Sequence, residues 1–122
     1  LSAFVRAELA MSDFKFSPKS WPLVATGGAF AVCRAILAAQ RGQSIDSRNP
    51  TMDLGELVEL KNRLCDMSLR ERAEVPHLPS SRADIIPAAL ITIVSLLNHI
   101  NRTSLTHSFY NLRYGVAAEM LQ

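Results

Sequence analysis

The sequence has no long block of like charge and no apolar run long enough to cross a membrane. Its 122 residues carry 13 basic and 11 acidic side chains, for a net charge of +2 at pH 7. Because these charges are scattered along the chain, we expect neither a DNA-binding arm nor a membrane-binding patch. The most apolar stretch, residues 85–97, is shorter than the roughly 20 residues that a membrane-spanning helix needs.

Cysteine is also scarce, since only Cys33 and Cys65 are present. Both fall on apolar stripes at helical spacing, which predicts buried free thiols. Two cysteines are too few for a disulfide framework, and no CxxC motif occurs. The three histidines have no zinc-ligand spacing, so we expect structural roles for them. This cysteine usage favours a reducing, cytoplasmic compartment.

What the sequence does contain is a core-forming composition, with 48% hydrophobic residues. Short runs rich in β-forming residues predict two strands, over residues 21–26 and 103–108. Helical periodicity predicts six helices, over residues 1–10, 29–41, about 52–65 after a cap at Thr51, 68–75, about 82–98 and 112–121. The expected fold class is therefore α/β. Because a two-stranded sheet is marginal, we expect further strands upstream of Leu1.

Capping signals mark where two of these helices begin. Ser68 and Glu71 have the S-x-x-E spacing of a capping box, and Ser81 and Asp84 form a similar pair before the long apolar helix. Pro87 falls in the first turn of that helix, where a missing N–H costs little. The helix is apolar nearly all round, which predicts a central position that is covered on most sides.

The first candidate for a binding site is the turn made by Gly27 and Gly28, between the strand 21–26 and the following helix. Glycines at such a turn let backbone N–H groups approach an anion, and the helix dipole favours negative charge there. The turn has neither the GK[ST] of a Walker A motif nor the GxGxxG spacing. From the residues alone, a tight structural turn with a positive φ is the preferred interpretation.

Three charged residues are weaker candidates. Asp84 stands beside Arg82 at the start of the buried helix, and Arg113 follows the strand 103–108. A capping carboxylate and a solvated arginine would explain these positions without any ligand. No nucleophile–base arrangement and no pair of carboxylates stands out, so the sequence assigns no catalytic residue to this chain.

Three segments, taken together, resemble one enzyme family. LVATGGAFAVCRAIL (residues 23–37) is similar to the family's strand, Gly-Gly-Thr turn and Ala-rich helix. Residues 52–97, with SLRER, a Pro-bounded loop and RAD opening a buried helix, and residues 105–121, with L-R-x-G, follow in the family's order and spacing. From residue 23 onward the sequence thus resembles the exopolyphosphatase/guanosine-pentaphosphate phosphohydrolase (Ppx/GppA) family.

This resemblance implies an actin-like, ribonuclease-H-like fold of two lobes with the active site in the cleft. Residues 1–122 would form a single partial domain, the C-terminal part of the second lobe. The complete protein would be a cytoplasmic homodimer that uses Mg²⁺ to hydrolyse inorganic polyphosphate or guanosine pentaphosphate. Because the family's phosphate loops and catalytic glutamate would lie upstream, we expect no metal ligand in this chain and no catalysis by it alone.

Matching the family's motifs gives the candidate substrate-facing residues Gly27, Gly28, Arg82, Asp84 and Arg113. Three departures affect the fine substrate contacts: Ala29 replaces the usual Thr, Tyr114 stands where an acidic residue is common, and Pro87 interrupts the usual small apolar run. Two other classes of function stay open from the sequence. One is a lobe of another actin-like ATPase or sugar kinase, and the other is a non-enzymatic helical interaction domain.

Overall fold

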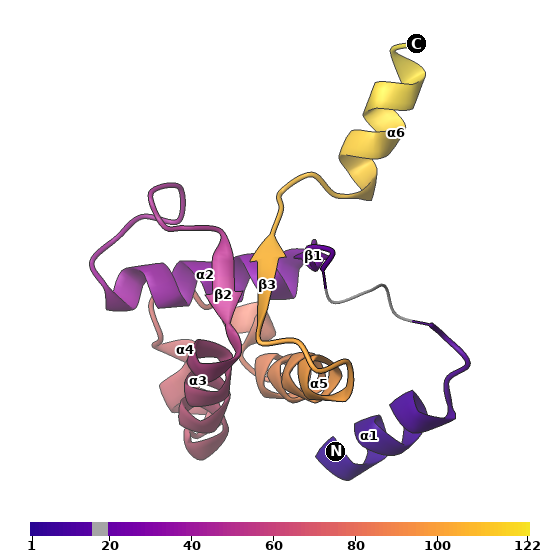
Figure 1. Ribbon diagram of the computed structural model, residues 1–122. Coiled ribbons are helices and arrows are strands. Elements are labelled where there is room, and N and C mark those ends of the chain that lie inside the picture. Colours follow the sequence, from indigo (N-terminus) through magenta and orange to yellow (C-terminus); the bar gives the residue numbers. More distant parts are fainter. Residues whose placement is uncertain (16–19) are drawn as a thin grey trace.

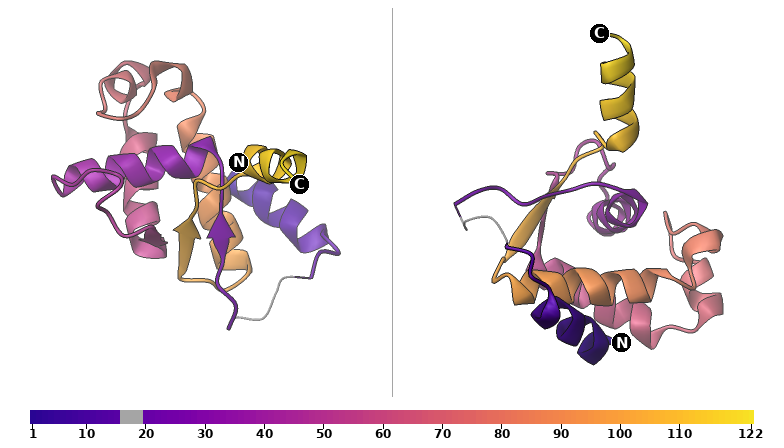
Figure 2. Two further views of the ribbon diagram at one scale, coloured as in Figure 1. Left: turned by 90° about the horizontal axis from the view of Figure 1, so that it is seen from above. Right: turned by 90° about the vertical axis from the view of Figure 1, so that its right-hand side faces the viewer.

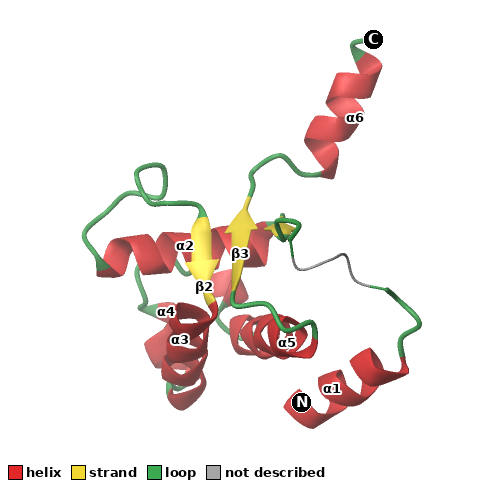
Figure 3. Cartoon of the chain, viewed as in Figure 1, coloured by secondary structure: helices red, strands yellow, loops and turns green. Residues whose placement is uncertain are grey.

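The structure is a computed structural model that describes residues 1–15 and 20–122 as helices around a small sheet (Figure 1). Its elements, in chain order, are α1 (Ser2–Met11), β1 (Val24–Ala25), α2 (Gly28–Gln40), β2 (Thr51–Asp53), α3 (Leu54–Asp66), α4 (Leu69–Ala73), the 3-10 helix η1 (Ser80–Arg82), α5 (Ile86–His99), β3 (Ser104–His107) and α6 (Leu112–Met120). All six expected helices are therefore present, and the helix-rich α/β class is confirmed. Figure 3 shows how short the strands are beside the helices.

The three strands form one sheet in the order β1-β3-β2. β1 runs parallel to β3, with Val24 opposite Thr106, whereas β2 runs antiparallel to β3, with Met52 opposite Leu105. Strand β3 therefore lies in the centre of the sheet and pairs with both β1 and β2. Both outer strands have an unpaired edge within the described part of the chain.

Strand β2 corrects the sequence prediction, which had only two strands and treated Thr51 as a helix cap. Thr51 instead pairs with Thr106 in the sheet. Asp53 is the N-cap of α3, and it forms a capping box with Glu56. A strand of three residues is too short for its alternation of buried and exposed side chains to be distinguished from a loop in the sequence.

The helices α2, α3 and α5 cover one side of the sheet (Figure 2). The side chains of Leu105 and His107 on β3 are buried on that side, and Met52 on β2 is buried with them. No described helix lies over the other face of the sheet (Figure 2). The hydroxyl oxygens of Thr51 and Thr106, on neighbouring strands, are 3.3 Å apart and only partly buried. This small sheet therefore has one covered face and one open face.

The core joins α2, α3, α5 and the sheet. Cys33 on α2 is fully buried, as expected, and burial raises the pKa of its thiol to about 12. Cys65 is exposed, so the prediction that both thiols are buried was wrong for this one. The buried side chains of α3 are Leu57, Leu60 and Leu64. Cys65 follows Leu64 directly, about 100° further round the helix, and so points to solvent.

The long apolar helix α5 occupies the central place that its sequence predicts, between α3 and α1. It starts later than expected, with Ile85 as its N-cap and Pro87 in its first turn. The expected capping pair of Ser81 and Asp84 does not form, because residues 80–82 adopt a 3-10 turn. The Arg82 side chain at the end of that turn reaches Gly28 at the start of α2.

The last helix, α6, stands away from the rest of the chain (Figure 1). None of its residues is buried, and Leu112 keeps 83% of its surface exposed. A nine-residue helix that buries no side chain is unstable in water by itself. The exposed apolar side chains of α6 therefore indicate a surface that packs against another protein segment. No helix in the described part of the chain is long and apolar enough to cross a membrane.

Candidate functional site

The candidate site lies where β1 and β3 end. These strands are parallel, so their carboxyl ends meet at one edge of the sheet. β1 leads into the turn Gly27-Gly28, and β3 leads through residues 108–111 into α6. The Ser108 N–H donates to the Ala25 carbonyl oxygen at 2.9 Å, which holds the two exits side by side. In open α/β sheets this edge is the usual place for a ligand.

Gly27 makes the turn between β1 and α2. Its φ of 114° and ψ of 167° lie in a region that only glycine adopts readily, so the positive φ expected from the sequence is confirmed. Gly27 is also the N-cap of α2, and no side chain caps this helix. The N–H groups of its first turn therefore lack the side-chain acceptor that most helices provide, and an anion could accept from them.

Arg82 reaches the same turn from η1. A Cβ built on Gly28 would stand 2.7 Å from Arg82 Cζ and still closer to its terminal nitrogens, so the guanidinium lies directly against the Gly28 backbone. Within the described residues, the Arg82 side chain makes no hydrogen bond and no ion pair. A cation at the positive end of a helix dipole is unfavourable by itself. An anion bound between them would relieve this repulsion.

The remaining predicted residues lie further from this point. Asp84 is exposed, and its carboxylate forms no ion pair with Arg82. Arg113 is exposed in the first turn of α6, where its N–H donates to Asn111 Oδ1 at 3.0 Å. The structure thus brings Gly27, Gly28 and Arg82 together. It leaves Arg113 at the same edge of the sheet without contact to Arg82.

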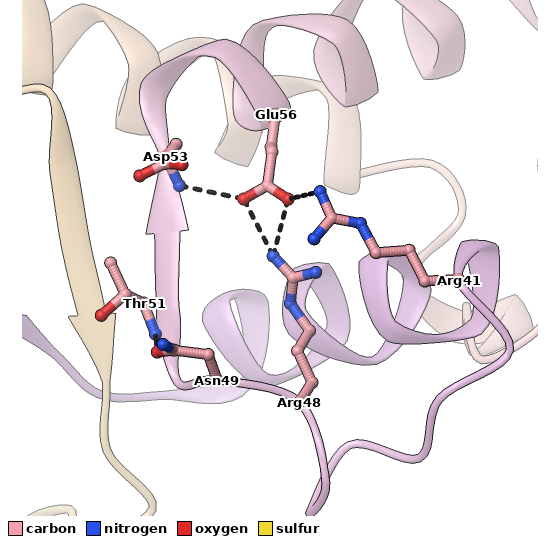
Figure 4. A network of polar contacts seen from close by, with 6 residues as sticks. All are labelled: Arg41, Arg48, Asn49, Thr51, Asp53 and Glu56. Carbon is pink, nitrogen blue, oxygen red and sulfur yellow. Dashed lines mark hydrogen bonds and ion pairs between the residues drawn. The ribbon is translucent and has the colours of Figure 1, made fainter.

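Sequence reasoning missed a network of arginines around Glu56, at the C-terminal end of α2 (Figure 4). Arg48 Nη2 donates to both carboxylate oxygens of Glu56, at 2.9 and 2.8 Å, and Arg41 Nη2 donates to Oε1 at 2.7 Å. Burial alone would raise the pKa of Glu56. The hydrogen bonds from Arg48 and from the Asp53 N–H, with the charges of Arg48 and Arg41, outweigh burial and hold that pKa below its usual value.

Arg34 extends this network through α2 to β3. Its Nη2 donates to the Arg48 carbonyl oxygen at 3.0 Å, and its Nη1 lies 3.5 Å from His107 Nδ1. Burial, and then the charge of Arg34, lower the pKa of His107, so the imidazole is neutral near pH 7. The signal in the sequence was an arginine within an apolar helix, AVCRAIL, whose neighbours at positions 33, 36 and 37 are all buried.

No three potential metal ligands gather anywhere in the described ranges 1–15 and 20–122. The polar groups at the Gly27-Gly28 turn are instead hydrogen-bond donors: the Arg82 guanidinium and the backbone N–H groups of the first turn of α2. Such a set binds the oxygens of an anion and does not bind a cation. The chemistry available at this edge is therefore recognition of an anionic group.

Comparison with known structures places the fold. A crystal structure of an Aquifex aeolicus Ppx/GppA family member matches 98% of this chain with a TM-score of 0.80 and 17% identity, and the match covers 39% of that protein. The type II variant of the Aquifex aeolicus Ppx/GppA phosphatase gives a TM-score of 0.83 and 17% identity, over 99% of this chain and 40% of that one. An exopolyphosphatase from Cytophaga hutchinsonii gives 0.75 and 20% identity, over 98% and 41%.

This chain therefore spans about two fifths of the length of these structures. At such identities the likeness shows the fold, and it confirms the helix-rich part of an actin-like fold that the sequence resemblance implied. No curated protein sequence matched the chain. The model of the Ppx/GppA phosphatase family matches residues 3–122, which is nearly all of the sequence. The chain belongs to the Ppx/GppA phosphatase family.

Proposed function

We propose that this chain is part of a phosphoanhydride hydrolase and that it supplies an anion-binding surface to the active site. The observation that carries this proposal is the contact of Arg82 with Gly28 at the uncapped start of α2. The guanidinium donors and the first-turn N–H groups converge there without an acceptor from the described residues. A terminal phosphate provides the charge and the several acceptor oxygens that such a surface needs.

The substrate class we propose is inorganic polyphosphate or guanosine pentaphosphate. Phosphoryl transfer depends mostly on positioning and on electrostatic stabilisation of the transferring group. The α2 N–H groups and Arg82 would hold a phosphate in place, and Arg113 would add a second cation from the first turn of α6. Bound Mg²⁺ would neutralise phosphate charge in the complete enzyme, although the donors at this edge are no ligands for it. Asp84 would act only at the rim, because it is exposed and unpaired.

Catalysis by this chain alone is not expected. No described residue near the turn can activate a water: the carboxylate closest in sequence to Arg82 is Asp84, which is exposed and has no partner that would hold it. A glutamate in the remaining part of the family fold would do this. The uncovered helix α6 and the open edge of β1 support the proposal that the site is completed by that remaining part.

For the complete protein we propose a cytoplasmic homodimer whose partner is polyphosphate or a nucleotide polyphosphate, with no role for DNA or a membrane. Membership of the Ppx/GppA phosphatase family favours this hydrolase over a sugar-kinase lobe or a non-enzymatic interaction domain.

The proposal is tested by titrating the chain with inorganic tripolyphosphate and following backbone and arginine side-chain signals by NMR. We expect the first-turn amides of α2 and the Arg82 Nε signal to shift. Because a charge-assisted hydrogen bond contributes about 1.5–3 kcal/mol, Arg82→Gln should weaken binding about tenfold or more.

The matched control is Arg70→Gln, since Arg70 is an exposed arginine on α4 with no contact to the turn. It should change the affinity less than twofold. Equal losses for the two variants would show non-specific charge attraction and would contradict the proposed site. Turnover of polyphosphate with Mg²⁺ by the purified chain, absent from a mock preparation, would contradict the expectation that it is inactive alone.

A further inference from the structure

Arg34 is a buried cation that has no carboxylate partner among the described residues. Its side chain comes from the middle of α2, and only 6% of the residue is exposed. Its acceptors are the Arg48 carbonyl oxygen and His107 Nδ1, and its Nε has no partner in the described part of the chain. Burying a guanidinium in this way is costly, and an apolar side chain would stabilise the core at least as well. The position therefore calls for a role other than core stability.

The contacts of Arg34 gather at the end of β3. Besides His107 Nδ1, the Phe109 ring lies under its guanidinium, with Cζ 5.3 Å from the ring centroid. His107 and Phe109 also contact each other edge to face, with their ring centroids 4.7 Å apart. Arg34 thus holds two aromatic rings from alternate positions of the same segment. Together the three residues form what we call the Arg34 clamp.

Among the described residues, the Arg34 clamp contains the last side-chain hydrogen bond and ring contacts that tie the segment before α6 to α2. The Ser108 N–H still pairs with the Ala25 carbonyl oxygen, but the side-chain contacts of Tyr110 and Asn111 are local. Tyr110 stacks edge to face on Tyr114, and Asn111 caps α6. The direction in which the chain leaves the sheet is therefore set by Ser108 and by the Arg34 clamp. The orientation of residues 110–120, which contact one another locally, depends on that direction.

We propose that Arg34 is a positioning residue that fixes the path of residues 108–111 and so places Arg113 at the sheet edge that carries the Gly27-Gly28 turn. The role of Arg113 as a phosphate contact rests on the proposed function, whereas the clamp itself does not. The clamp works with a neutral imidazole, because His107 Nδ1 must accept from Arg34. The one charged side chain that contacts His107 within the described residues is Arg34, so a protonated His107 would face a cation without a nearby carboxylate.

The test compares backbone ¹⁵N relaxation and chemical shifts of residues 108–116 in the wild-type chain and in three variants. Phe109→Leu removes the ring at a half-exposed position and leaves the core intact. Phe109→Tyr keeps the ring and serves as the matched control. Arg34→Lys keeps the charge but loses the forked donors that reach Arg48 and His107 together. We expect Phe109→Leu and Arg34→Lys to increase the mobility of residues 109–116 with core signals unchanged, and Phe109→Tyr to behave as wild type.

Unchanged mobility of residues 109–116 in both Phe109→Leu and Arg34→Lys would overturn the proposal, as would a wild-type segment already as mobile as in these variants. Tripolyphosphate affinity is measured on the same samples. We expect Phe109→Leu to weaken it severalfold, because Arg113 is no longer held, and Phe109→Tyr to leave it unchanged. If the wild-type chain binds no tripolyphosphate, the proposed function fails, and the relaxation data still decide whether Arg34 positions the segment.

Discussion

The guanidinium group of Arg82 occupies the place where a side chain at Gly28 would begin. In Gly28→Ala, the new Cβ would overlap with this group, which must then move. Because the obstacle is the end of a flexible side chain, and because alanine favours a helix by about 1 kcal/mol over glycine, we expect the free energy of unfolding to change by less than about 1 kcal/mol. Affinity for tripolyphosphate, measured by calorimetry, should fall about tenfold since Arg82 is displaced.

Two other glycines provide controls for this substitution. Gly27→Ala meets no atom within 4 Å, but it forces a φ of 114° on an alanine and should lower the free energy of unfolding by about 1–3 kcal/mol. Gly55→Ala lies in open space near the start of α3 and should stabilise the chain slightly. If Gly28→Ala lowered stability as much as Gly27→Ala without changing affinity, the contact would be structural only.

Glu56 allows a second comparison, between one buried and one exposed arginine that bind the same carboxylate. The Arg48 side chain is 4% exposed and that of Arg41 is 61% exposed. Without Arg48, the largely buried Glu56 carboxylate keeps only the exposed Arg41 as an ion-pair partner among the described residues, so Arg48→Met should lower the free energy of unfolding by about 3 kcal/mol. Arg41→Ala breaks an exposed pair and should cost less than about 1 kcal/mol. Urea denaturation at pH 7 measures both, and similar losses would contradict the assignment of Arg48 as the buried partner.

The covered parts of the fold were predictable from the sequence because they rest on periodic burial. The long helix α5 shows this: its apolar residues indicated a central position, and it packs between α3 and α1. Strand β2 escaped because three residues carry no period, and its pairing with β3 is set by residues some 50 positions away. Cys65 was misplaced because one residue at the border of an apolar stripe decides between core and solvent.

The candidate site divides in the same way. The Gly27-Gly28 turn was predictable, since its backbone conformation depends on neighbouring residues alone. That Arg82 contacts Gly28 was not predictable from local pattern, because 54 positions separate them and only the packing of η1 against α2 brings them together. The buried Arg34 was visible as a charge in an apolar helix, but its partners His107 and Phe109 come from β3 and beyond.

His107 makes the free energy of unfolding depend on pH just below about 6.5, where Glu56 does not titrate. Its pKa in the folded chain lies below the ordinary value of 6.5, so the unfolded chain binds the proton first as the pH falls. Stability is therefore fully present above about pH 6.5 and is lost as the pH falls through the folded-state pKa. Glu56, whose pKa is lowered from 4.5, contributes a loss only at more acidic pH.

This pH dependence is measured by urea denaturation between pH 7.5 and 5. We expect His107→Gln to remove most of the change between pH 6.5 and 5. His77 is exposed, so His77→Gln serves as the control and should retain the wild-type profile. A wild-type slope that persists in His107→Gln would mean that another group titrates in this window.

The two cysteines should differ sharply in reactivity. Cys65 is exposed, whereas Cys33 is buried and its pKa is raised to about 12, so almost none of it is thiolate near pH 8. With a disulfide reagent at pH 8, we expect one thiol per folded chain to react quickly and the second only after urea is added. Cys65→Ser should abolish the fast reaction. A fast reaction that survives in this variant would show that the core around Cys33 opens readily.

Removing helix α6 should change the association of the chain without changing its free energy of unfolding. Because none of its residues is buried, removing residues 112–122 deletes no core contact. The free energy of unfolding of the remaining chain should therefore stay within about 0.5 kcal/mol of wild type in urea denaturation. The exposed apolar side chains, Leu112, Tyr114, Val116, Met120 and Leu121, should bind a hydrophobic dye or promote self-association in the full chain, and the truncation should reduce both. A loss of more than about 1 kcal/mol on truncation would show that α6 packs onto the rest of this chain in solution, so that no surface is left for the remainder of the family fold.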